Sequence, residues 1–383
     1  SALPLRLRAP ADYVPTSGDA ARQQPRSSDT ADLIARAGRL AATGDHDGAL
    51  ALLDAALERE PDNEEALKAR GRVRIQARDY DGARADYDRA VDLDPADHAA
   101  VLGQGSAAYW QGKYDEAIVS FSVALRLDPA DAATLASRAT TYYQIGRWER
   151  SLADYRALKT SSPNSEAARS GELLALIHLG RGEEARVLIE AMLAEDETSG
   201  GALYALSTLN RQAGSPGATL PALDRAIAAA PAADHLLSLR GQIRAAVGDE
   251  AGARSDFAAI RDSDPNDPDV ANSVCWGQAI AGFDLEQALA DCDRALSAGE
   301  AAYIDSRAMV LLQLGRYAEA RAEYERALIG APRQAASHYG LGLSRLALGD
   351  AGGREDLLKA RAIDIDVAED FAVFEARHPE LTR

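Results

Sequence analysis

"HAAVLGQGSAAYWQGKYDEAIVSFSVALRLDPAD" spans His98–Asp131, a stretch in which small and helix-breaking residues occupy regular places. Gly105 and Ala117 are small residues within two apolar segments, Gly112 separates the segments, and Pro129 follows the second. Glycine permits the left-handed conformation that ends many helices, and proline prevents a helix from continuing. The stretch therefore predicts two antiparallel helices joined by a short turn.

The same spacing continues along most of the chain. Prolines recur at one fixed interval or at twice that interval, at Pro61, Pro95, Pro129, Pro163, Pro231 and Pro265. Glycines recur at the same interval, at Gly112, Gly146, Gly180, Gly214, Gly248 and Gly282. A fixed period of this length indicates stacked repeats, because one helical hairpin cannot bury its apolar face alone.

Composition supports a helical protein and limits its partners. Apolar residues make up 46% of the chain and aromatic residues 5%, a balance that favours helices over a β-sandwich or barrel. The net charge of −18 comes without any run of Lys or Arg, which argues against nucleic acid as a partner. No apolar stretch approaches the roughly 18 residues of a transmembrane helix. We therefore predict an all-α chain with no membrane span.

These residues resemble the tetratricopeptide repeat, a helix-turn-helix unit of about 34 residues. With proline at position 32, His98–Asp131 matches the family pattern at positions 8, 15, 17, 20, 24, 27 and 32, and Ala301–Gln334 does the same. Larger apolar residues at position 24, such as Phe257, are expected to fill the space between neighbouring hairpins. The resemblance implies a right-handed superhelical solenoid of about ten such repeats. The repeats begin near Thr30, Glu64, His98, Ala132, Glu166, Gly200, Asp234, Pro268, Ala301 and Ala335.

The two ends of the chain depart from the repeat. Residues 1–29 are predicted to form an extended arm and linker, either flexible or the last strand of an upstream domain. The solenoid is assigned to residues 30–367. Residues 368–383 are predicted to form a capping helix and tail, with Phe371 and Phe374 turned inward. Such a cap is needed because the last hairpin of a stack otherwise exposes its apolar side.

Motifs of catalysis are missing from the sequence. There is no HExxH, GxSxG or CxxC motif and no glycine-rich phosphate loop. A metal at Asp45, His46 and Asp47 is conceivable, but a turn rich in Asp and Gly is more often only a turn. We predict no catalytic residue, no metal site and no cofactor, so that this chain is not an enzyme.

The tetratricopeptide resemblance also implies a binding surface. In that family, positions 2, 5, 9, 12 and 13 of the first helices line the inner groove, where rings and amide or guanidinium donors suit an extended peptide. The alternative is that the aromatic residues pack in the core. The implied function is a protein interaction scaffold that holds a peptide or protein partner in its concave groove. The predicted groove residues are Lys68, Arg72, Tyr109, Trp110, Tyr143, His178, Tyr204, Arg211, Trp276 and Tyr339.

A second resemblance concerns the last third of the chain, including "CWGQAIAGFDLEQALADCDRAL", and the N-terminal "LRAPADYVPTSGD". Both stretches resemble proteobacterial envelope proteins in which such repeats follow a domain of unknown function and a transglutaminase-like or retropepsin-like domain. The resemblance implies a periplasmic or secreted location, with the cytoplasm as the alternative. It also implies an alternative function, the substrate-positioning or assembly arm of a transglutaminase-like or protease-like enzyme whose catalytic domain lies upstream.

The chain has only two cysteines, Cys275 and Cys292. Cys275 falls at position 8, and after one extra residue in the turn Cys292 falls at position 24. Crossing helices at a small-residue contact can bring two Cβ atoms within the roughly 3.5–4.5 Å that a disulfide needs. An oxidising compartment favours a disulfide here, and a cytosol favours two reduced core thiols.

Overall fold

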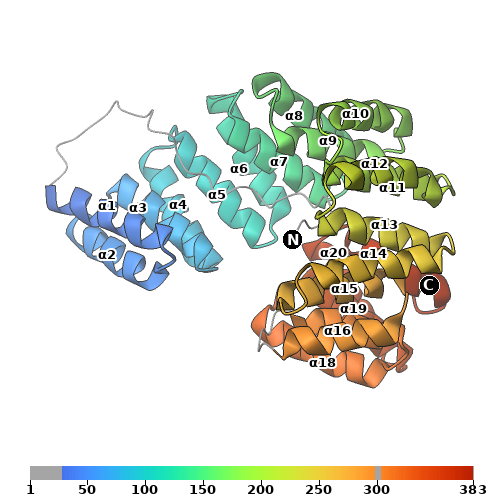
Figure 1. The fold of residues 1–383 in the computed structure, drawn as a ribbon. Helices are drawn as coiled ribbons and strands as arrows, with labels where there is room; N and C mark the ends of the chain where they lie inside the picture. Colours follow the sequence, from blue (N-terminus) through green and yellow to red (C-terminus); the bar gives the residue numbers. More distant parts are fainter. Residues whose placement is uncertain (1–27, 298–302, 383) are drawn as a thin grey trace. The chain divides into compact units, whose positions relative to one another are not determined.

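The computed structural model describes residues 28–297 and 303–382. Every regular element within these two ranges is a helix, so the all-α prediction is confirmed (Figure 1). Most of the arm predicted in residues 1–29 lies outside the described residues. None of the described helices is both long enough and apolar enough to cross a bilayer.

Successive helices pair into hairpins, and the chain divides after residue 179 into two compact modules, 28–179 and 180–382. The N-terminal module contains α1 (Ser28–Ala42), α2 (His46–Arg59), α3 (Glu64–Gln76), α4 (Tyr80–Leu93), α5 (His98–Trp110), α6 (Tyr114–Leu127), α7 (Ala132–Gln144), α8 (Trp148–Ser161) and α9 (Glu166–His178).

The C-terminal module has the same hairpin organisation and ends in two short helical segments, η3 and α21. It contains α10 (Gly182–Glu195), α11 (Gly200–Gln212), η1 (Pro216–Thr219), α12 (Leu220–Ala229), α13 (Asp234–Ala246), α14 (Glu250–Ser263), α15 (Pro268–Ala281), α16 (Leu285–Leu296), α17 (Ile304–Gln313), α18 (Tyr317–Gly330), α19 (Ala335–Ala347), α20 (Gly353–Ile363), η3 (Val367–Phe371) and α21 (Ala372–Arg377).

Each hairpin turns at a residue in the left-handed conformation. Gly112 has φ 79° at position 15 of its repeat, where a side chain would be strained. Arg78 stands at the same position of the preceding repeat and has φ 63°. The turn is therefore kept even where the glycine is missing, because the packing of the two helices imposes it. The first helix of the next hairpin then starts at an acidic cap, as where Asp97 accepts a hydrogen bond from the Ala100 amide.

Hairpins stack through an aromatic ring held between glycines. Tyr87 of α4 is 6% exposed, and its ring faces Gly71 of α3 and Gly103 of α5. A Cβ atom added at Gly71 would lie 2.8 Å from the ring, and one added at Gly103 would overlap it. Phe257 of α14 fills the same position in the C-terminal module. This confirms the expectation that large residues at position 24 fill the space between neighbouring hairpins.

We expect Gly103→Ala to lower the free energy of unfolding by about 1–3 kcal/mol, because the new methyl group overlaps the Tyr87 ring and overpacks the contact between α4 and α5. The matched control is Gly38→Ala in α1, which meets no atom within 4 Å and should gain up to about 1 kcal/mol from helix propensity. Urea unfolding followed by circular dichroism measures both changes. A Gly103→Ala protein as stable as wild type would contradict this packing.

Candidate functional site

A row of polar and aromatic side chains runs along the first helices of the N-terminal module. Gln76 of α3, Trp110 of α5, Gln144 of α7 and His178 of α9 all occupy position 13 of their repeats, each one repeat after the last. Gln76 is exposed and the other three are half-buried. Equivalent residues of stacked hairpins lie in a line, so amide groups and rings alternate along it. We call these four residues the position-13 row.

The two rings of this row are held by aromatic residues of the preceding hairpin. Trp110 stacks on Tyr80 with ring centroids 5.9 Å apart and planes 9° apart. His178 stacks on Trp148 at 4.8 Å and 22°. Aromatic pairs contribute about 0.5–1.5 kcal/mol beyond their buried area. The rings are therefore ordered before any partner binds, which reduces the entropy lost on binding.

The two predicted basic groove residues of α3 differ in their surroundings. Lys68 donates a hydrogen bond to Asp97 at 2.5 Å, so its charge is neutralised within the fold. Arg72 is half-buried and has no ion-pair or hydrogen-bond partner among the described residues. Arg72 and Gln76 are four residues apart on one helix and so lie on one face. Arg72 is thus an available cation next to the position-13 row.

A small open pocket adjoins the same row. It is lined by Arg78, Tyr80, Asp81, Gln111 and Lys113, together with Asp79. The side-chain amide of Gln111 donates to Asp81 at 2.7 Å, whereas its oxygen is buried and has no hydrogen-bond partner within the described ranges. Tyr80 lines this pocket and also stacks on Trp110, so the pocket lies next to the position-13 row.

Three predicted groove residues belong to the core. Tyr109, Tyr143 and Tyr339 are 9%, 3% and 0% exposed. The Tyr109 ring packs edge-on against Tyr114 at 5.4 Å, and the Tyr143 ring packs edge-on against His178 at 5.2 Å. Their burial corrects the expectation that they line an open groove. Large rings at helical spacing fill the space between helices because that removes the most apolar surface from water.

The remaining predicted groove residues lie in the C-terminal module. Tyr204 and Arg211 of α11 both contact Glu369 of η3, through a hydrogen bond of 3.4 Å and an ion pair of 3.5 Å. Tyr339 of α19 donates to Glu375 of α21 at 2.5 Å. Trp276 is half-buried against the largest apolar cluster of this module. The segment after the last hairpin therefore covers three of the four predicted positions here.

Two buried titratable groups of this module have shifted pKa values. The pKa of Tyr339 is raised to about 12, mainly by burial and secondly by the hydrogen bond to Glu375. Burial raises the pKa of Asp305 on α17 to about 6, and the negative charge of Asp370 adds to the effect. Among the described residues no group of three His, Cys, Asp or Glu side chains is placed to hold a metal ion. These shifts reflect packing around η3 and α21.

A set of buried ion pairs had not been predicted from the sequence. Asp256 of α14 is 3% exposed and accepts hydrogen bonds from Arg240 at 2.6 Å and Arg244 at 2.8 Å, both on α13. These hydrogen bonds hold the pKa of Arg240 above its usual value. Asp86 has the same arrangement in the N-terminal module. The sequence pattern that indicates these ion pairs is Arg at positions 7 and 11 together with Asp at position 23 of the same repeat.

A disulfide joins Cys275 of α15 to Cys292 of α16, with Cα atoms 5.4 Å apart. Both cysteines are fully buried. The bond links the two helices of one hairpin between positions 8 and 24. Other hairpins pack a small residue against a large one at these positions, as Gly71 packs against Tyr87. It is a covalent support of the fold and lies away from the surface.

Comparison with solved structures shows the fold. A tetratricopeptide repeat protein from Parabacteroides merdae matches with a TM-score of 0.52 and 16% identity, over 74% of this chain and all of that chain. TTC0263, a tetratricopeptide protein from Thermus thermophilus, matches with a TM-score of 0.39 and 19% identity, over 47% of this chain and 98% of that chain. A search of curated proteins found no match.

The family model for the tetratricopeptide repeat matches several segments of the chain, which together cover more than half of it. The matched residues are 34–97, 68–132, 137–201 and 306–362. These segments include hairpins of both modules, and they contain the Gly112 turn and the Tyr87 contact described above. The chain belongs to the tetratricopeptide repeat family.

Proposed function

We propose that this chain is a non-catalytic protein interaction scaffold and that its N-terminal module binds an extended peptide segment of a partner protein. The observation that carries this proposal is the position-13 row, in which amides and pre-stacked rings alternate on four successive first helices. Side-chain amides can pair with the backbone of an extended peptide, and rings supply contact area at low entropy cost.

The positive charge of Arg72, next to the position-13 row, supports a preference for a peptide that carries a carboxylate. Arg72 lies beside Gln76 and has no ion-pair partner among the described residues. A carboxylate of the bound peptide can take that place, since a guanidinium forms strong bidentate hydrogen bonds with carboxylates. We therefore propose that the peptide carries an acidic residue or its C-terminal carboxylate at the α3 end of the row.

The proposal predicts a defined pattern of lost affinity for a peptide selected from a random phage-displayed library on the full-length chain. Trp110→Ala should weaken its binding about 30-fold, as expected for loss of an aromatic hot spot worth about 2 kcal/mol. Gln144→Ala should weaken binding by a smaller factor. Fluorescence anisotropy with the labelled peptide measures each dissociation constant.

The matched control is Val119→Ala on α6, a second-helix residue that is 63% exposed and should leave the affinity unchanged. Circular dichroism of each variant shows whether it keeps its helices, and Gln144→Ala tests the row without removing an aromatic contact. Selected peptides that bind Trp110→Ala and Gln144→Ala as tightly as wild type would rule out the row as the binding surface.

We also propose that the protein works in an oxidising compartment, periplasmic or extracellular. The disulfide between two fully buried cysteines supports this, because disulfides persist where thiols are not kept reduced. Mass spectrometry of the protein isolated from its native source without reductant tests the location. Two free thiols would favour the cytoplasm instead.

A further inference from the structure

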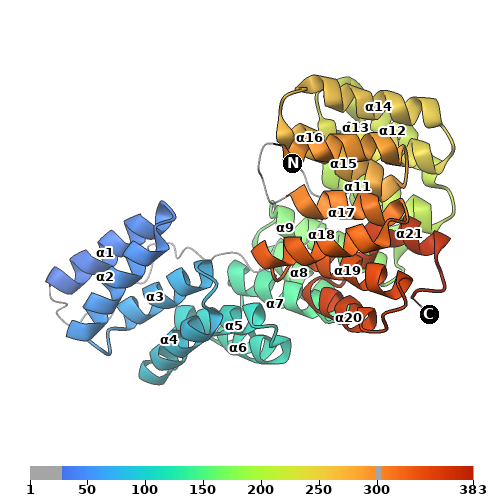
Figure 2. The same cartoon turned by 90° about the horizontal axis from the view of Figure 1, so that it is seen from below.

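The segment 367–377, made of η3 and α21, contacts three hairpins besides the one that an end cap must cover. We call it the tail segment. A cap of a helical stack needs to cover only the last hairpin, here α19 and α20. The tail segment also contacts α11, the C-terminal end of α15, and α17. Figure 2 shows α21 beside α17. Its contact with Tyr204 joins residues 165 positions apart in the sequence.

One polar contact lies at the N-terminal side of the tail segment. Glu369 accepts a hydrogen bond from the Tyr204 hydroxyl at 3.4 Å and lies 3.5 Å from the Arg211 guanidinium. The two partners occupy positions 5 and 12 of one repeat, both of which belong to the peptide-binding positions expected for the family. The side chains of Glu369 and Arg211 remain 34% and 50% exposed. This ion pair can therefore be changed without opening the core.

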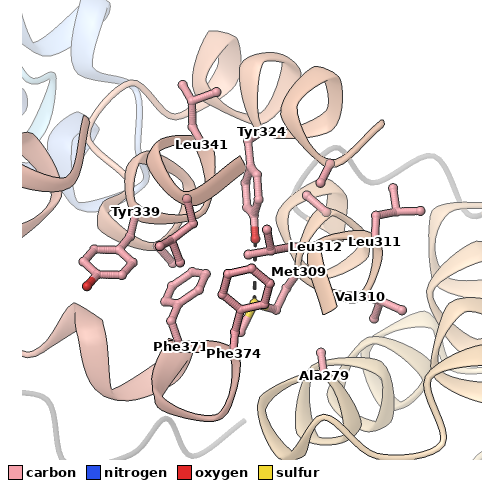
Figure 3. Close-up of a cluster of buried hydrophobic side chains, with 14 of the residues drawn as sticks. Ala279, Met309, Val310, Leu311, Leu312, Tyr324, Tyr339, Leu341, Phe371 and Phe374 are labelled. Atoms are coloured by element: carbon pink, nitrogen blue, oxygen red, sulfur yellow. Dashed lines mark hydrogen bonds between the residues drawn. The ribbon is translucent and has the colours of Figure 1, made fainter. Parts of the chain in front are cut away.

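The centre of the tail segment is apolar. Phe371 and Phe374, three residues apart, are 0% and 1% exposed. The Phe371 ring lies 5.0 Å from the ring of Tyr339, and both phenylalanines point into the cluster that contains Met309 and Leu312 of α17 (Figure 3). Two buried aromatic anchors of this kind are typical of a short helix held by a binding surface.

The C-terminal side of the tail segment ends on polar groups of two further hairpins. The Arg377 guanidinium donates to the Gly282 carbonyl at 3.1 Å and to the Gln313 side-chain oxygen at 3.4 Å. Gln313 occupies position 13 of its repeat, the position that forms the row of the N-terminal module. A glutamine at this position therefore contacts the tail segment.

We propose that Tyr204, Arg211, Gln313 and Tyr339 form a second peptide-binding surface, whose resident occupant is the chain's own tail segment. The ligand class is a short helix with two aromatic residues three positions apart, an acidic residue before them and a basic residue after them. This inference concerns the C-terminal module and does not rest on the position-13 row of the N-terminal module. Because only residues 364–366 link the tail segment to α20, its effective concentration is high, and a free peptide of this class cannot readily displace it.

The test uses the full-length chain and a fluorescein-labelled peptide with the sequence of residues 364–383. Phe371→Ala with Phe374→Ala in the chain loosens the tail segment and should raise the affinity for the labelled peptide at least tenfold over wild type. A peptide carrying the same two alanines should bind neither protein. Absence of peptide binding to a double variant that keeps its helical circular dichroism would overturn the proposal.

A charge exchange provides an independent test that leaves the core intact. In the full-length chain, Glu369→Arg should increase amide hydrogen exchange of residues 367–377 at least tenfold, because it faces Arg211. Arg211→Glu combined with Glu369→Arg should restore protection. Unchanged amide hydrogen exchange in Glu369→Arg would refute the contact between Glu369 and Arg211. This outcome does not depend on the result with the double phenylalanine variant. Wild-type dimers that exchange tail segments between copies would refute the assignment of the chain's own tail as the occupant.

Discussion

Asp256→Ala is expected to lower the free energy of unfolding by about 3–5 kcal/mol, the usual cost of removing one partner from a buried ion pair. Asp256 is 3% exposed and accepts hydrogen bonds from Arg240 and Arg244, whose side chains are 15% and 21% exposed. Without the carboxylate, two largely buried guanidinium groups lose their common partner. Their desolvation is then offset only by exposed carboxylates, such as Asp224. Urea unfolding followed by circular dichroism measures the loss.

The matched control uses the same arginine. Asp224 also pairs with Arg240, at 2.8 Å, but its side chain is 54% exposed. Asp224→Ala should therefore cost less than about 1 kcal/mol, as solvent-exposed ion pairs do. Raising the salt concentration should reduce the small Asp224 effect more than the Asp256 effect, because screening acts mainly on exposed charges. Equal losses for the two variants would show that burial does not decide the strength of these pairs.

Reduction of the disulfide between Cys275 and Cys292 is expected to cost about 3 kcal/mol, the loop-closure value for a chain loop of this size. The two cysteines are 17 residues apart, and the bond restricts the unfolded chain between α15 and α16. Urea unfolding of wild type with and without reductant measures the difference. The control is Cys275→Ala with Cys292→Ala, whose unfolding should not respond to reductant. Identical wild-type curves under both conditions would contradict a stabilising disulfide.

The two modules use position 13 in different ways. In the N-terminal module, Gln76, Trp110, Gln144 and His178 form a row for which we propose an extended partner. In the C-terminal module, Gln313 contacts Arg377 of the tail segment. If both proposals hold, a partner of the whole protein binds first through the N-terminal module, because the second surface already holds a tethered occupant.

Much of the fold could be predicted from the repeat period. The first helices α3, α5, α7, α9, α11 and α13 begin at the constant interval that the proline and glycine series indicate. Arg78 shows the strength of this constraint, since it adopts φ 63° where glycine was expected. The signals are local, because a turn, a cap or a small residue at a crossing is specified within one hairpin.

The candidate site was predicted only in part. The family positions indicated the helices that carry the position-13 row, but they did not distinguish Trp110, which is half-buried, from Tyr143, which is 3% exposed. Exposure at these positions depends on what the neighbouring hairpin places against the ring. Trp148, for example, begins α8 and stacks on His178 one hairpin later. The Arg and Asp pairs could not be predicted with the same certainty, because charged residues at helical spacing more often lie on solvated faces than meet inside a hairpin.

The sequence by itself determined the repeat, its turns and the order of the hairpins, because each hairpin is built from residues close together in the chain and packs mainly on its neighbours. Only the tertiary structure decided where the tail segment lies. Glu369 meets Tyr204 across 165 residues, and this contact exists because of the way the intervening hairpins stack. Small rotations between successive hairpins accumulate over the stack. That geometry turns what the sequence predicted as an end cap into a segment bound across the first helices of the C-terminal module.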